Sequence, residues 1–354
     1  MIVLTCIDKK ILPTATFIEV STQGHSFITF IVAFLLISRV ATGLARYNTA
    51  RDCLGTMYRE SRELIQHTCV FSSGDTSAKA AQWRHDVAYR CLILLHSVMA
   101  VIDFSTDGVP AWEVPELNGK EKQYVMNTLY ADNNSIQSNR RWAHHGQAAS
   151  DWEESMRVPI RLEYLLCTAI HAQAKTLTED LGLFENKLLG SVGSFMVGYD
   201  GMRKFLTTVT SSSSCVSLFA RLLSHSYSSQ PVPFPLIQMA RTFLFLYVFT
   251  VPFVLLKDQS PLFAHCFSVF LLTYGFVGLE LVAIELDDPF GNDANDLDNG
   301  ALAMTAYEDI YLTVLDLDGP EWTDKLRVRM HNPSVVTKVP LEQEWLVEAV
   351  RDIM

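Results

Sequence analysis

The sequence predicts an all-α protein, in which a polytopic bundle of membrane helices continues into a cytosolic helical region. Three apolar segments, 20–38, 234–256 and 260–279, each have about the 20 residues that a helix needs to cross a bilayer. Charged residues make up only 19% of the chain, whereas soluble domains have about 25%. Much of the chain between polar loops has the apolar spacing of amphipathic helices.

The first apolar segment is the most informative. Residues 20–38 contain no Asp, Glu, Lys or Arg, and Arg39, Arg46 and Arg51 then follow at roughly helical spacing. This pattern predicts a helix that leaves the membrane and continues as an amphipathic rod. A buried core helix is the alternative for this segment taken alone.

The other apolar segments differ in length. Segment 234–256 carries one charge, Arg241, and Pro252 near its end, which a membrane helix tolerates. The uncharged centre of segment 83–104 is too short for a span, so we expect a buried helix of the soluble region, with His96 as a core histidine. Segments 157–183 and 184–207 also have helical patterns.

Composition and motifs exclude several classes of function. The net charge of −11 and the lack of a basic stripe argue against nucleic acid as a partner. Seven scattered cysteines without CxxC spacing indicate buried thiols rather than a disulfide framework or a zinc site. Phosphate-binding loops, nucleophile elbows and HExxH helices are absent from the sequence, so we predict that the protein is not an enzyme.

An acidic loop follows the last apolar segment. The helical pattern ends in carboxylates, Glu280, Glu285 and Asp287, and Pro289 then prevents its continuation. The loop after Pro289 is rich in Asp and Asn, which gives a compact set of oxygen ligands. Its Asp side chains either hold a cation or cap the following helix.

Three blocks of sequence resemble the bestrophin family: ISRVATGLARYNTARDCLG at 37–55, PVPFPLIQMARTFLFLYVFTVPF at 231–253 and YGFVGLELVAIELDDPFGNDANDLD at 274–298. The matching positions of the first block are Arg39, Thr42, Arg46, Tyr47, Arg51 and Gly55. The resemblance implies a homopentameric, multi-pass anion channel for chloride or bicarbonate. It also implies a thylakoid location in a photosynthetic source, and a plasma or internal membrane otherwise.

The resemblance also implies a pore neck on the first membrane helix, at Gln23, Phe27 and Ile31. These residues follow an i, i+4, i+8 line on one helix face. Rings of apolar side chains make a constriction that gates by dewetting. The alternative is that Phe27 and Ile31 pack against lipid or neighbouring helices. A second constriction is expected near Leu183.

In the acidic loop the resemblance implies calcium as a possible cofactor, held by Asp293 and Asp296 with Asn292. Calcium takes six to eight oxygen ligands, and a tight turn of carboxylates, amides and carbonyls supplies them. The EF-hand spacing is absent from the sequence. Capping of the next helix is the alternative role of these aspartates.

The expected organisation is an N-terminal segment with the pore helix at 1–60, a cytosolic helical region at 61–208 and a Ser-rich insertion at 209–230. Two membrane helices at 231–286 and the loop, returning helix and tail at 287–354 follow. The family has a further membrane helix before the pore helix, for which about 20 residues leave no room. Departures from the family pattern after Arg39 indicate a divergent, algal branch. The alternative function is a non-conducting or truncated paralogue that acts as a membrane scaffold or as a subunit of a hetero-oligomer.

Overall fold

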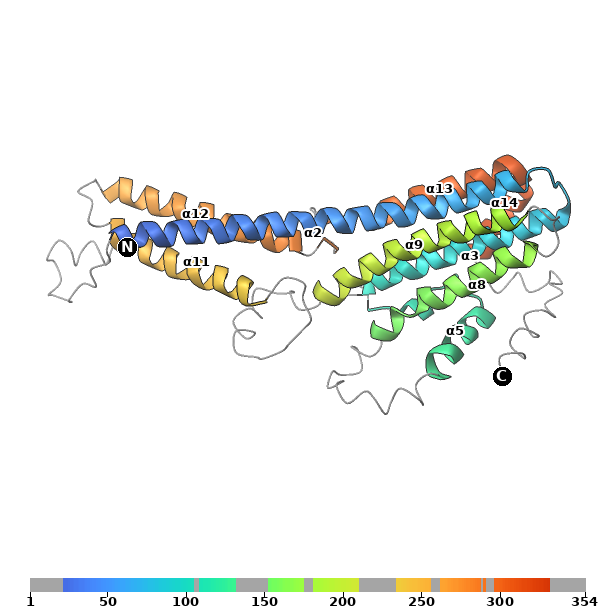
Figure 1. Cartoon of the computed structure of the whole chain (residues 1–354), viewed down its shortest axis with the longest axis horizontal. Helices are drawn as coiled ribbons and strands as arrows, with labels where there is room; N and C mark the ends of the chain where they lie inside the picture. Colours follow the sequence, from blue (N-terminus) through green and yellow to red (C-terminus); the bar gives the residue numbers. More distant parts are fainter. Residues whose placement is uncertain are drawn as a thin grey trace. The chain divides into compact units, whose positions relative to one another are not determined.

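The computed structural model describes residues 22–104, 108–131, 152–174, 181–209, 234–255, 262–287, 289–290 and 296–331. The regular elements of this part of the chain are all helices (Figure 1), which confirms the predicted all-α class. They are α2 (Thr22–Phe71), α3 (Ala78–Ile102), η1 (Ala111–Glu113), α5 (Gly119–Ala131), α8 (Val158–Ala174), α9 (Leu181–Val209), α11 (Phe234–Leu255), α12 (Leu262–Asp287), α13 (Asn299–Asp318) and α14 (Pro320–His331). They form two compact units, which are described separately.

Helix α2 is continuous over 50 residues, as its apolar segment followed by an amphipathic rod predicted. Several threonines along it bond to their own helix backbone. The hydroxyls of Thr29, Thr42 and Thr49 each donate to the carbonyl oxygen four residues earlier, at 2.8 Å. These bonds satisfy the hydroxyls without a partner from outside the helix. Polar side chains are therefore compatible with an apolar environment along this helix.

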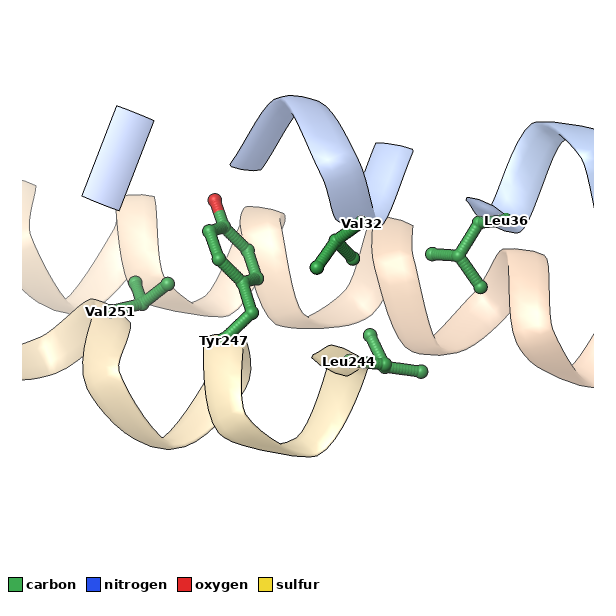
Figure 2. Packing of buried hydrophobic residues seen from close by; sticks show 5 residues of the cluster. All are labelled: Val32, Leu36, Leu244, Tyr247 and Val251. Carbon is green, nitrogen blue, oxygen red and sulfur yellow. The ribbon is translucent and has the colours of Figure 1, made fainter. Parts of the chain in front are cut away.

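The first unit packs α11 and α12 against the N-terminal part of α2. Its core is a layer of aliphatic side chains around one tyrosine, drawn in Figure 2: Val32, Leu36, Leu244, Tyr247 and Val251. The Tyr247 ring stacks on His25 at a centroid distance of 4.9 Å and meets Phe276 edge-on at 5.0 Å. One side chain thus joins all three helices of this unit.

Among the described helices, four are long and apolar enough to cross a membrane. In the most apolar 18-residue stretch of α2 and of α11, only 22% of the residues are buried inside the protein. In that of α12, the share is 11%. In α3 the corresponding share is 72%. Since a span in lipid needs an apolar exterior, α3 fits the predicted buried helix, and the other three fit the predicted spans.

Helix α3 is central to the second unit, in which it contacts α8, α13 and α14. The second part of α2 meets α9 closely in the same unit. A Cβ atom at Gly198 would lie 2.8 Å from Cγ of Met57 and 3.0 Å from the carbonyl oxygen of Cys53. Because real Cβ atoms do not approach so closely, glycine at this position permits the approach of the two helices.

The cysteines of the described chain are free thiols, at 53, 69, 91, 167 and 266. Cys69 and Cys91 are buried, and burial raises the pKa of each thiol to about 12. Such thiols stay protonated and unreactive at neutral pH. The prediction of buried thiols is confirmed for these two residues, whereas Cys266 is exposed.

Three helical elements lie in polar parts of the chain for which no helix was predicted. They are η1 and α5, within 108–131, and α14 in the C-terminal part. Pro320 is the first residue of α14, where its fixed φ and missing N–H cost nothing. Helix α12 ends at Asp287, two residues before Pro289, as the proline predicted.

A buried ion pair fastens α13 to α3 within the second unit. Nε of Arg84 donates to both oxygens of Asp318, at 3.1 and 2.9 Å, and Nη1 donates to the carbonyl oxygen of Ser72 at 3.1 Å. Only 2% of the Arg84 side chain and 4% of the Asp318 side chain are exposed. Burial of both partners is tolerated because the geometry is bidentate and the remaining donors are used.

Substitution of Arg84 should therefore destabilise the second unit strongly. Arg84→Met leaves the Asp318 carboxylate buried without a counter-charge, which costs about 3–5 kcal/mol. Urea unfolding followed by tryptophan fluorescence measures the loss. Lys325→Gln, which removes an exposed i,i+4 pair with Glu321, is the control and should change stability by less than about 0.5 kcal/mol. Equal losses of stability in the two variants would show that the Arg84–Asp318 ion pair does not stabilise the second unit.

Candidate functional site

One face of α2 in the first unit carries large apolar side chains without cover. Phe27, Phe30, Phe34 and Ile37 are 61–71% exposed. Val32 and Leu36, in contrast, are fully buried and point toward α11 (Figure 2). At 3.6 residues per turn, the exposed and buried residues lie on opposite sides of the helix. Helix α2 therefore packs with one face and leaves the other open.

The predicted neck residues Phe27 and Ile31 differ in their exposure. Phe27 lies on the open face, whereas Ile31 is half-buried at its edge. Gln23 belongs to α2, but its side chain is outside the described ones. Sequence reasoning did not single out Phe30 and Phe34, which the helical period places nearer the centre of the open face.

The other predicted site residues lie in the second unit or in the acidic loop. Leu183, near the start of α9, is 80% exposed. Asn292 and Asp293 are outside the described residues, and Asp296 is half-buried just before α13. The helix cap is Asp298, whose Oδ1 accepts a hydrogen bond from the backbone N–H of Ala301 at 2.8 Å. The capping role proposed for the loop aspartates is thus performed by a residue that was not singled out.

A buried ionic cluster joins the three membrane helices of the first unit. Nε of Arg241 donates to Oε1 of Glu280 at 2.8 Å, and Nη1 of Arg39 lies 3.4 Å from the same oxygen. Nη2 of Arg39 also donates to Oδ2 of Asp287 at 3.3 Å. The side chains of Arg39 and Glu280 are less than 10% exposed. One carboxylate on α12 therefore holds an arginine of α2 and an arginine of α11.

Further along α2, the same packed face meets the end of α12. Nη1 of Arg46 lies 4.0 Å from Oδ1 of Asp287, and its guanidinium lies over the Phe205 ring at 5.9 Å. A Cβ atom at Gly43 would lie 3.1 Å from Cβ of Leu286. Small residues at such crossings let helix backbones approach closely. Arg39, Gly43 and Arg46 thus hold α2 against α12, and they do not belong to the open face.

The open face of α2 is suited to apolar contacts. Among the described residues, no group of three or more His, Cys, Asp or Glu side chains is placed to hold a metal ion. The exposed Phe and Ile side chains of α2 carry no charge and no hydrogen-bonding group. An uncovered apolar face of this size marks a contact with lipid, with another chain or with a hydrophobic passage.

Long apolar helices with exposed faces define a multi-pass membrane protein. Known proteins agree with this class. Residues 223–311 match the family model described as Bacterial/Fungal Bestrophin protein. A crystal structure of a bacterial bestrophin homolog from Klebsiella pneumoniae superposes with a TM-score of 0.62 at 15% identity, over 88% of this chain and 92% of that one. A second crystal structure, described as a membrane protein, gives 0.63 at 15% identity, over 88% and 94%.

Curated relatives match over shorter segments. The chain is 32% identical over 75 residues to the voltage-dependent anion channel-forming protein sll1024 of Synechocystis sp., which is 21% of this chain and 24% of the relative. It is 34% identical over 70 residues to the voltage-dependent anion channel-forming protein YneE of Salmonella typhi, over 20% and 22%. The matched segment thus spans about a quarter of these relatives. The bestrophin family model thus matches one part of the chain, whereas the similarity of fold to a bacterial bestrophin homolog extends over most of it.

Removal of the Glu280 carboxylate should loosen the three-helix unit. Glu280→Ala leaves Arg39 and Arg241 buried without this partner, a change that costs about 3–5 kcal/mol. Thermal unfolding of the detergent-purified protein measures the effect. Glu285→Ala is the matched control, because Glu285 lies on the same helix but is exposed. A Glu280→Ala protein as stable as the Glu285→Ala protein would show that the cluster does not hold the unit together.

Proposed function

We propose that the protein is an anion channel, with the open face of α2 lining a central pore for chloride or bicarbonate. The observation that supports this proposal most is the line of uncharged aromatic and aliphatic side chains on α2, opposite its packed face. The names of the two curated relatives point to the same activity in those proteins. The fold of the bacterial bestrophin homolog extends the similarity to most of the chain.

One helix cannot enclose a pore, so several copies of the chain must contribute. We propose a homopentamer, in which five α2 helices surround the axis. Rings of apolar side chains then form a neck whose wetting controls the passage of ions. Two lines of residues on α2 compete for this role. One is the predicted line of Gln23, Phe27 and Ile31, and the other is the line of Phe30, Phe34 and Ile37 on the open face.

Planar-bilayer recording of purified protein tests the neck and distinguishes the two lines. Phe34→Ala should enlarge the current several-fold if the open face lines the pore, because a smaller side chain widens and wets the constriction. Ile31→Ala should do so if the predicted line forms the neck. Phe249→Ala, which truncates an exposed Phe on α11, is the control and should leave the current unchanged.

Two outcomes would count against a pore on α2. One is unaltered conductance in both α2 variants, and the other is an equal effect of the α11 control. The absence of current from a protein that native mass spectrometry shows to be pentameric would favour the alternative of a non-conducting scaffold. For the location we propose the thylakoid membrane if the source is photosynthetic, and a plasma or internal membrane otherwise.

Calcium binding by Asn292, Asp293 and Asp296 is proposed as a separate feature of the acidic loop. Carboxylate, amide and carbonyl oxygens in a short loop suit this ion. Isothermal titration with calcium should give heat for the native protein and much less for Asp296→Asn. Asp324→Asn, an exposed substitution on α14, is the control. A native protein that releases or absorbs no heat would refute the site.

A further inference from the structure

The open side of α2 continues beyond its apolar part. In the second unit, the exposed residues of this helix include Asp52, Gly55, Arg59, Gln66 and Val70. Twenty-five residues separate Phe34 from Arg59, and this number is close to seven helical turns of 3.6 residues. Arg59 therefore has the same phase on α2 as Phe34. The exposed line changes from apolar side chains to charged ones along a single helix.

Arg59 is held in place by its own helix. Its Nη2 donates to Oε1 of Glu60 at 3.1 Å, and its Nε lies 3.8 Å from Oε1 of Glu63, one turn away. The Arg59 side chain is nevertheless 55% exposed, whereas that of Glu60 is only 12% exposed. Of the charges in this pairing, the guanidinium is thus the most accessible to a passing ion. The two carboxylates restrict its rotamers without covering it.

The neighbouring arginine has a different role. Nη1 of Arg62 donates to Oδ2 of Asp309 on α13 at 3.1 Å, so it is turned toward another helix of the same unit. A cavity of about 590 Å³ lies beside this pair, lined by residues of both α2 and α13. Among the described residues, the ion pairs of Arg59 are with Glu60 and Glu63 of α2 itself. Arg62 fastens α13 to α2, and Arg59 is available for another function.

We propose that Arg59 is a specificity-determining residue, which favours anions over cations in the part of the path that follows the apolar neck. The inference rests on the proposed channel function, with the exposed line of α2 facing the path. Several copies of Arg59 around an axis bring a ring of guanidinium groups to the path, each more exposed than the two carboxylates that it pairs with, and rings of arginine favour anions. At physiological salt the Debye length is about 8 Å, so the ring acts on ions that pass close to it.

Asp52 carries the opposite charge to Arg59 on the same side of α2. It lies seven residues earlier, about two turns, and therefore has nearly the same phase on α2. Its side chain is exposed. A negative ring at this level repels anions as the Arg59 ring attracts them. Neutralising the two residues one at a time should consequently move the anion preference in opposite directions.

Reversal potentials under a salt gradient measure this preference in planar bilayers. Arg59→Gln should lower the chloride-to-sodium permeability ratio by about threefold, since unit charges a few ångströms apart interact appreciably even in water. Arg59→Lys should retain the native ratio, and Asp52→Asn should raise it. Lys325→Gln removes a cation from another i,i+4 pair, on α14, and should have no effect.

Salt dependence separates an electrostatic role from a structural one. The difference between the native protein and Arg59→Gln should be largest at low salt and nearly vanish at 1 M, where the Debye length is about 3 Å. A conducting Arg59→Gln channel with the native permeability ratio at low salt would overturn the inference and leave the channel function intact. Failure of the native protein to conduct would instead refute the proposed function.

Discussion

The carboxylate of Glu280 is the interaction on which the arrangement of the membrane helices depends. It lies between Arg39 of α2 and Arg241 of α11, at 3.4 and 2.8 Å, and is almost fully buried. Charges removed from water are tolerated only when they are paired with good geometry. Any rotation of α2 or α11 about its own axis would separate one guanidinium from this carboxylate. The cluster therefore fixes which face of α2 is packed and which is open.

The open face of α2 is a consequence of the orientation that the ionic cluster gives to this helix. With Arg39 and Gly43 turned toward α12, the helical period directs Phe30 and Phe34 to the opposite side. The aliphatic core of Val32 and Leu36 against α11 reinforces the same orientation (Figure 2). In the proposed channel, the ionic cluster therefore has an indirect role. It does not line the pore, but it orients the side chains of Phe30 and Phe34 that line it.

The membrane helices could be predicted from the sequence because length and hydropathy alone define a span. The pairing of Arg241 with Glu280 could not, since it joins residues 39 positions apart and depends on how three helices pack. Helices α5 and α14 were not predicted because they are short and mostly polar, so that few apolar residues mark their buried side. Their burial in the second unit is decided by tertiary contacts.

The neck residues remain a prediction. The family pattern selects Phe27, which is exposed, but counting along a pattern selects one i, i+4 line and does not reveal which side of the helix is packed. Phe30 and Phe34 could have been found from the helical phase of the charged residues, because Arg39 and Arg46 mark the packed face. The helix cap at Asp298 could have been predicted from the sequence, because an Asp directly before a helical pattern is a typical N-cap.

The central claim is that the open face of α2 meets water and not lipid. Cysteine accessibility tests it directly, in a background where the native cysteines are replaced. The variants Phe34→Cys on α2 and Phe249→Cys on α11 are each exposed to a charged, water-soluble thiol reagent in membranes. The account predicts rapid modification and altered current for Phe34→Cys, with neither for Phe249→Cys. An unreactive Phe34→Cys protein, or equal labelling of the two helices, would contradict it.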